Sequence, residues 1–159
     1  DPRQPMVEVS WHGARDFADW LSRKTGTTYR LPTEAEGEYA CRAGNPQRFC
    51  CGDTLELRRY AWYKGNSGSR THPVGQKQSN ELGIYDMSGN VYEWCADGYD
   101  DDYYSRSPSR NPKGPFSGSY RVLRGGSWYD NADILRCANR NYGNLSHSND
   151  VIGFRLARD

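Results

Sequence analysis

The sequence lacks the features that mark several broad classes of protein. It has no run of lysine or arginine, and its 21 basic residues nearly balance its 20 acidic ones, so no nucleic-acid-binding or anionic-membrane surface is indicated. No apolar run approaches the roughly 20 residues that cross a bilayer, so we expect no membrane insertion by this domain. Its five cysteines, Cys41, Cys50, Cys51, Cys95 and Cys137, form no Cys-x-x-Cys pair, which argues against a zinc knuckle or a thioredoxin-like site.

Length and composition predict one loop-rich domain. The 159 residues suffice for a single domain with its own core. Hydrophobic residues make up only 35% of the chain, but aromatic residues reach 13%, alongside 17 Gly and 8 Pro. This balance favours a fold held together by Trp and Tyr rather than by long aliphatic helices.

Two helices are expected in the first third of the chain. Ser10 is a suitable N-cap for a helix that runs to about Lys24. A capping box at residues 33–36 begins a second helix, which runs to about Arg42 and is ended by Gly44.

The rest of the chain predicts short strands joined by loops. Residues 60–63 and 83–87 are short aromatic or apolar runs, typical of strands or tight turns, and residues 97–119 have loop composition. Strands are expected at residues 91–95, which should be half-buried, and at residues 120–124 and 151–156. Two early helices followed by short strands, with no internal repeat, indicate the α+β class.

Six sequence blocks carry a resemblance to a known family over nearly the whole chain. They are Val9–Trp11, Tyr29–Glu36, Pro73–Gly75, Gly83–Trp94, Arg124–Trp128 and Ile152–Leu156. In this order they resemble the sulfatase-modifying factor, or formylglycine-generating enzyme, family. The resemblance implies a C-type-lectin-like fold with two helices and short irregular antiparallel strands, in one domain over residues 1–159 that lacks the family's N-terminal strands. Gly37 stands where the family usually has Trp, so packing under the second helix is expected to differ.

The residues that the family uses for catalysis are not found. Formylglycine-generating enzymes bind copper and oxidise a substrate cysteine with two cysteines that follow the Gly-Gly-Ser block. The matching stretch here, Trp128–Leu135, contains no cysteine. Related sulfoxide synthases use three histidines and iron, whereas His12, His72 and His147 lack metal-type spacing. We therefore expect no catalytic residues and no required cofactor, with a formylglycine-generating-type oxidase or related metal-dependent oxidoreductase as the disfavoured alternative.

Two structural sites are implied by the resemblance alone. Cys41 and Cys137 resemble positions that form a disulfide in the family, and we expect them to pair in an oxidising compartment. A family calcium site resembles Ser88, Gly89, Val91 and Glu93, whose oxygens suit Ca²⁺. The alternative is a structural turn in which Glu93 caps backbone N–H groups.

The composition changes sharply over residues 129–151. This segment contains no Lys, Glu, Gln, Met or Trp, although all five occur before it. Those five residue types are the ones whose codons all end in a purine, so every residue present fits a codon that ends in a pyrimidine. The pattern is expected if AAC codons were randomised at both adenines. It resembles the variable proteins of bacterial and phage diversity-generating retroelements, many of which use this scaffold.

On this interpretation the domain is a non-catalytic ligand-binding protein with a hypervariable C-terminal surface. Its partner would be an unknown protein or glycan, and a cell-surface or extracellular location is favoured over a cytoplasmic one. The side chains must then be exposed and replaceable, with Tyr for contact area and Ser, Asn and Gly for adaptable hydrogen bonds. The alternatives are an ordinary Asn/Ser-rich loop and a purely structural surface protein. The predicted variable positions are Tyr129, Asp130, Asn131, Asp133, Ile134, Asn141, Tyr142, Gly143, Asn144, Leu145, Ser146, His147, Ser148, Asn149 and Asp150.

Overall fold

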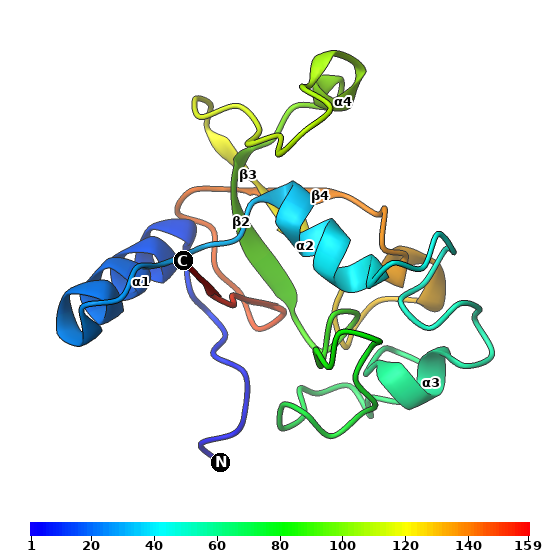
Figure 1. The fold of residues 1–159 in the computed structure, drawn as a ribbon. Coiled ribbons are helices and arrows are strands. Elements are labelled where there is room, and N and C mark those ends of the chain that lie inside the picture. Colours follow the sequence, from blue (N-terminus) through cyan, green and yellow to red (C-terminus); the bar gives the residue numbers. More distant parts are fainter.

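Strand β2 (Tyr92–Gly98) is an inner strand of a four-stranded sheet with the order β4-β3-β2-β5. The computed structural model describes residues 1–159, and Figure 1 shows helices α1 and α2 beside this sheet. β3 (Tyr120–Arg124) is antiparallel to both β2 and β4 (Asn141–Asn144), whereas β5 (Ile152–Gly153) runs parallel to β2. A separate two-stranded sheet pairs β1 (Tyr29–Arg30) with β6 (Ala157–Arg158).

The two predicted helices are confirmed together with their N-terminal caps. α1 spans Trp11–Thr25, and the Ser10 side chain accepts a hydrogen bond from the Gly13 N–H at 3.2 Å. α2 spans Glu34–Arg42, and both hydrogen bonds of the capping box at Thr33 are present. It ends at Arg42 as predicted, although the left-handed C-cap residue is Ala43, and Gly44 after it also has a positive φ. No helix has both the length and the apolarity needed to cross a bilayer.

Three short helices were not predicted, because each is too brief to show helical periodicity. They are α3 (Leu57–Tyr60), α4 (Tyr103–Arg106) and the 3₁₀ helix η1 (Ala132–Leu135). α3 therefore ends inside the predicted strand or turn at residues 60–63, and α4 lies inside the predicted loop. The turn before α3 is set by Asp53, whose carboxylate accepts hydrogen bonds from the N–H groups of Leu55 and Glu56.

The strand predictions were right in place but wrong in detail. β3 has the expected bounds. Of the strand expected at 151–156 only β5 forms, and β6, which belongs to the other sheet, begins just after that range. β2 is buried at five of its seven positions instead of alternating, because it is an inner strand covered on both faces. Trp94 is 0% exposed, and its indole N–H donates to the Val9 carbonyl at 2.9 Å.

The two cysteines expected to pair lie together in the core. The Sγ atoms of Cys41, on α2, and Cys137, after η1, are 2.7 Å apart. Both side chains are buried in a cluster with Cys50 and Met87. The structure therefore brings the thiols into contact, and their oxidation to a disulfide stays a prediction.

We predict that the air-oxidised protein carries a Cys41–Cys137 disulfide and that its reduction lowers the free energy of unfolding. The bond would close a loop of about 96 residues, for which the loss of unfolded-chain entropy is worth about 2–5 kcal/mol. Denaturant unfolding with and without dithiothreitol measures the change. The Cys51→Ser variant should keep this response to reduction, and the Cys137→Ser variant should lose it. Equal unfolding midpoints in both redox conditions for the wild type would contradict the pairing.

Candidate functional site

Nine of the fifteen predicted variable positions have side chains that are exposed to water. We call these nine residues the exposed face: Tyr129, Asn131, Asp133, Tyr142, Asn144, Ser146, His147, Ser148 and Asp150. Of the other six, Asn141, Leu145 and Asn149 are half-buried, and the remaining three are described below.

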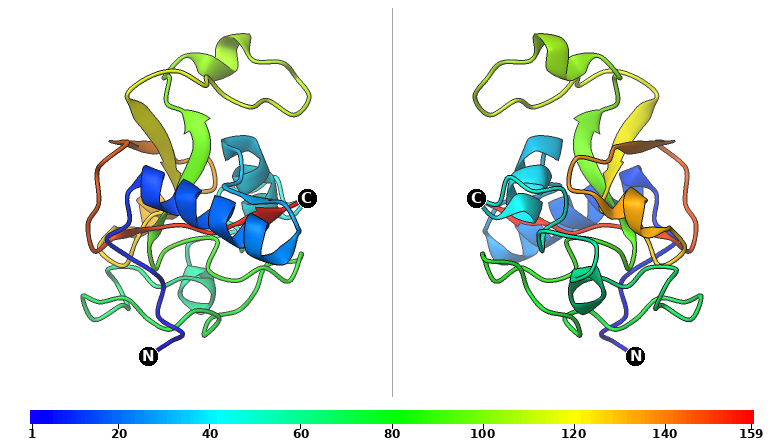
Figure 2. Two further views of the ribbon diagram at one scale, coloured as in Figure 1. Left: turned by 90° about the vertical axis from the view of Figure 1, so that its left-hand side faces the viewer. Right: turned by 90° about the vertical axis from the view of Figure 1, so that its right-hand side faces the viewer.

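Residues 129–151, which we call the variable segment, are held on one side of the molecule by pairing in the sheet and by one side-chain hydrogen bond. In the left-hand view of Figure 2, β4 and the chain after it lie along the left edge, and in the opposite view they lie along the right edge. The pairing of β4 with β3 turns Tyr142 and Asn144 outward and Gly143 inward. The Trp128 indole N–H donates to the Asp150 carbonyl at 3.2 Å, so the two ends of the segment meet.

Tyrosines from outside the variable segment extend the exposed face. Tyr142 packs against Tyr99 and Tyr120, with ring centroids 4.3 and 5.2 Å apart. The Arg140 guanidinium lies over the rings of Tyr99 and Tyr104, at 4.9 and 5.1 Å from their centroids. Sequence reasoning missed these three tyrosines. The signal available was the density of Tyr between residues 99 and 120, which predicted only a loop.

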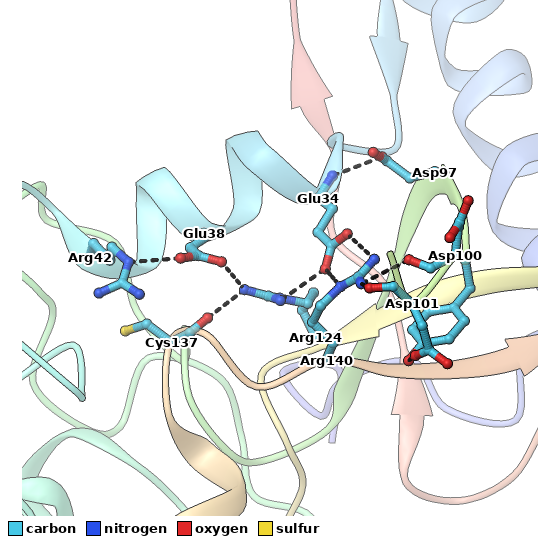
Figure 3. A network of polar contacts seen from close by, with 10 residues as sticks. Glu34, Glu38, Arg42, Asp97, Asp100, Asp101, Arg124, Cys137 and Arg140 are labelled. Carbon is cyan, nitrogen blue, oxygen red and sulfur yellow. Dashed lines mark hydrogen bonds and ion pairs between the residues drawn. The ribbon is translucent and has the colours of Figure 1, made fainter. Parts of the chain in front are cut away.

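A buried ionic network holds the backbone beneath this face (Figure 3). The Glu34 carboxylate on α2, 1% exposed, binds Arg124 of β3 at 2.9 Å and Arg140 at 2.7 and 3.0 Å. Arg124 also binds Glu38 at 2.5 Å and donates to the Cys137 carbonyl. A buried carboxylate is stable only with such partners, so α2, β3 and the chain around Arg140 are fixed relative to one another.

Arg140 connects this network to the loop after β2. Its guanidinium donates to the Asp100 carbonyl at 2.9 Å while it binds Glu34. At the same N-terminal end of α2, the Glu34 backbone N–H donates to the Asp97 carboxylate at 2.8 Å. Burial raises the pKa of Asp97 to about 6, because removal from water disfavours its charged form.

Three predicted variable positions do not fit a replaceable surface. The Asp130 carboxylate forms the turn after β3, where it accepts hydrogen bonds from the Ser127 N–H at 2.9 Å and the Ser127 hydroxyl at 2.6 Å. Ile134 packs against two core clusters. Gly143 is buried, and a Cβ there would lie 2.7 Å from the Trp94 ring. For these three residues the codon pattern overlooked a role in the scaffold.

Two residues of the expected calcium site have side chains engaged in other interactions. Arg155 binds both oxygens of the Glu93 carboxylate, at 2.5 and 2.7 Å. The Ser88 hydroxyl is buried and donates to the Leu135 carbonyl at 3.3 Å. Glu93 is the only carboxylate of the set, and the guanidinium on both of its oxygens disfavours a cation there. Calcium binding by Ser88, Gly89, Val91 and Glu93 stays a prediction. The geometry favours the structural alternative, although Glu93 binds an arginine rather than capping backbone N–H groups.

The histidines show no arrangement that suits a metal. His72 stacks on Trp62 at 3.7 Å and contacts the Ser67 carbonyl at 2.6 Å, whereas His12 and His147 are exposed. No group of three or more His, Cys, Asp or Glu side chains is placed to hold a metal ion.

The fold and this exposed segment define a C-type-lectin-like α+β domain, which is a class shared by variable proteins and formylglycine-generating enzymes. The chain belongs to the family described as the sulfatase-modifying factor enzyme 1-like domain, which it matches over residues 1–159.

Among solved structures, Treponema denticola variable protein 1 superposes with a TM-score of 0.92 at 33% identity, covering 97% of this chain and 70% of that one. PvdO from Pseudomonas aeruginosa superposes with a TM-score of 0.91 at 38% identity, covering 100% of this chain and 63% of that one. The Major Tropism Determinant U1 variant superposes with a TM-score of 0.59 and covers 94% of this chain and 37% of that one. At 14% sequence identity it shows likeness of fold alone.

Curated relatives are longer than this chain. The serine/threonine-protein kinase pkn1 of Chlamydia caviae is 43% identical over 98% of this chain, which spans 24% of that kinase. The formylglycine-generating enzyme of Streptomyces coelicolor is 37% identical over 99% of this chain, which spans 54% of that enzyme.

We predict that neighbouring positions in β4 differ sharply in their tolerance of substitution. Gly143→Ser places a Cβ against the fully buried Trp94 ring and should lower the free energy of unfolding by about 1–3 kcal/mol. Asn144→Ser, on the exposed side of the same strand, should change it by less than about 0.5 kcal/mol. Urea denaturation of both variants measures the difference, and equal losses would show that β4 does not separate fixed from replaceable positions.

We predict that Asp97→Asn gains stability relative to the wild type at pH 7 and that this gain shrinks at pH 5. Between an unfolded pKa of about 4 and a folded pKa of about 6, the native protein binds more protons than the unfolded chain. The free energy of unfolding of the wild type therefore rises as the pH falls through this range. The amide of the variant does not titrate, and its oxygen still accepts the hydrogen bond from the Glu34 N–H. Denaturant unfolding at both pH values measures the change. A stability difference that is independent of pH would contradict the burial of a charged Asp97.

Proposed function

We propose that this domain is a non-catalytic ligand-binding module that recognises a protein or glycan through the exposed face, which a diversity-generating retroelement alters. The observation that carries the proposal is the separation of two kinds of residue within residues 129–151. Nine side chains point to water, and Leu135, Cys137 and Arg140 between them are held by the core or by Glu34.

The chemistry of the face suits recognition of changing partners. Tyr129 and Tyr142 are 65% and 49% exposed, and tyrosines give large contact areas with little rotamer entropy to lose. Tyr120 and Tyr99 support Tyr142 from outside the segment, so part of the contact area would stay constant while its surroundings change. The likeness to a Treponema denticola protein named as variable supports the same function.

The oxidase alternative has less support from the residues. The stretch after Gly126 in which the enzymes carry their cysteines contains none here. Cys137, which follows that stretch, contacts Cys41 inside the core and is 4% exposed, so it is not available to a substrate peptide. Because the chain spans 24% of the kinase and 54% of the formylglycine-generating enzyme, the activities of those proteins are not carried over.

A matched pair of display libraries tests the proposal. One library randomises the nine positions of the exposed face with codons that end in cytosine, and the other randomises nine exposed positions of α1 and residues 107–119 in the same way. Both are selected against hen egg-white lysozyme as a probe protein. We expect binders from the first library at least about tenfold more often than from the second, because its randomised positions lie beside the constant Tyr99 and Tyr120 on a fixed backbone.

Folding is measured in the same experiment. We expect most members of the first library to melt within about 6 °C of the parent, since nine surface changes of about 0.5 kcal/mol and of either sign sum to about 1.5 kcal/mol. Equal numbers of binders from both libraries, or a majority of unfolded members in the first, would refute the exposed face as an interchangeable recognition surface.

A further inference from the structure

A cavity of about 300 Å³ lies beneath α2, on a part of the molecule that includes no residue of the exposed face. Gly37, in the middle of α2, forms part of its wall, and a Cβ added at Gly37 meets nothing within 4 Å. The helix therefore presents open space where a side chain would ordinarily fill the core. Packing under α2 was expected to differ from that of the family, because Gly37 stands where the family usually has Trp, and the open space agrees with that expectation.

The cavity wall is largely apolar and rich in sulfur. Half of its 18 lining residues are hydrophobic, among them Cys41, Met87, Cys95 and Trp94. Sulfur atoms make favourable contacts with aromatic rings, and an apolar wall disfavours a strongly hydrated occupant. A flat aromatic ring suits this wall better than a polar molecule does.

The charges around the cavity leave one cation without a counter-ion. Arg136, which is half-buried and lines the cavity, donates to the Asp133 carbonyl but forms no ion pair. The three lining carboxylates already have arginine partners: Glu36 binds Arg30, Glu38 binds Arg124, and Glu93 binds Arg155. A ligand with one negative charge therefore finds an unpaired guanidinium and no unpaired carboxylate to repel it.

We propose that this cavity binds a small planar aromatic carboxylate, with its ring under Gly37 and its carboxylate on Arg136. An indole-sized ring is the largest we expect, because the volume also has to hold the acid group. The site is separate from the proposed recognition face, so either can fail without the other.

Calorimetric titration with three probes of similar ring size tests this site: indole-3-acetate, indole and tryptamine. We expect indole-3-acetate to bind at least about tenfold more tightly than indole, since its carboxylate forms a charged hydrogen bond that indole lacks. Tryptamine, which carries a positive charge, should bind more weakly than indole. Equal affinities for the three probes would overturn the role of Arg136.

Two substitutions at Gly37 separate filling of the cavity from a change in helix propensity. Gly37→Ala leaves most of the space open, so it should bind indole-3-acetate as the wild type does and melt about 2–4 °C higher, because Ala favours the helix. Gly37→Trp should fill the cavity, abolish binding and melt at least as high as Gly37→Ala. If Gly37→Trp does not fold, Gly37→Leu should still weaken binding.

Arg136→Gln gives an independent test that leaves the cavity itself intact. It should reduce the affinity for indole-3-acetate to that for indole and leave the affinity for indole unchanged. Undiminished binding of indole-3-acetate to folded Gly37→Trp, or no binding of any probe to the wild type, would overturn the proposal.

Discussion

The buried carboxylate of Glu34 is the interaction on which the arrangement of this domain depends. It binds one arginine from β3 and a second from the chain between η1 and β4, so three segments distant in sequence meet at one side chain. Removing a partner from such a buried pair leaves an uncompensated charge, at a typical cost of about 3–5 kcal/mol. The network therefore makes the position of Arg140 nearly independent of the residues on either side of it. A surface on which side chains change needs such a fixed backbone.

Under the proposed function, the direction in which each side chain points separates structural from recognition roles. Leu135 and Cys137 point into the core, and Arg140 points to Glu34, while residues beside them point to water. In β4 the separation follows the pleat of the strand, with Gly143 against Trp94 and its two neighbours outside. The same family also contains enzymes. Under the proposed function, the same scaffold carries a binding module as well as enzymes, a case of function residing in sites rather than in folds.

Local signals in the sequence were enough to predict helices α1 and α2, the α+β class and most of the exposed face. Ser10 and the capping box at Thr33 act over three residues, so their hydrogen bonds could be predicted without the fold. Two-residue strands such as β5 and β6 leave no periodicity, so β5 was predicted too long and β6 was not predicted. The pKa of Asp97, the approach of Trp94 to Gly143 and the packing of Tyr99 and Tyr120 on Tyr142 all depend on long-range contacts. No pattern within one segment could reveal them.

The most direct test of an interchangeable face on a fixed scaffold is the DNA sequence around the gene. We expect a near-identical second copy of the codons for residues 124–156 beside a reverse transcriptase gene, with differences confined to adenines of that copy. Those adenines should fall on codons of the exposed face and spare the codons for Leu135, Cys137 and Arg140. Absence of the second copy, or differences concentrated on the residues that the core and Glu34 hold, would contradict the account.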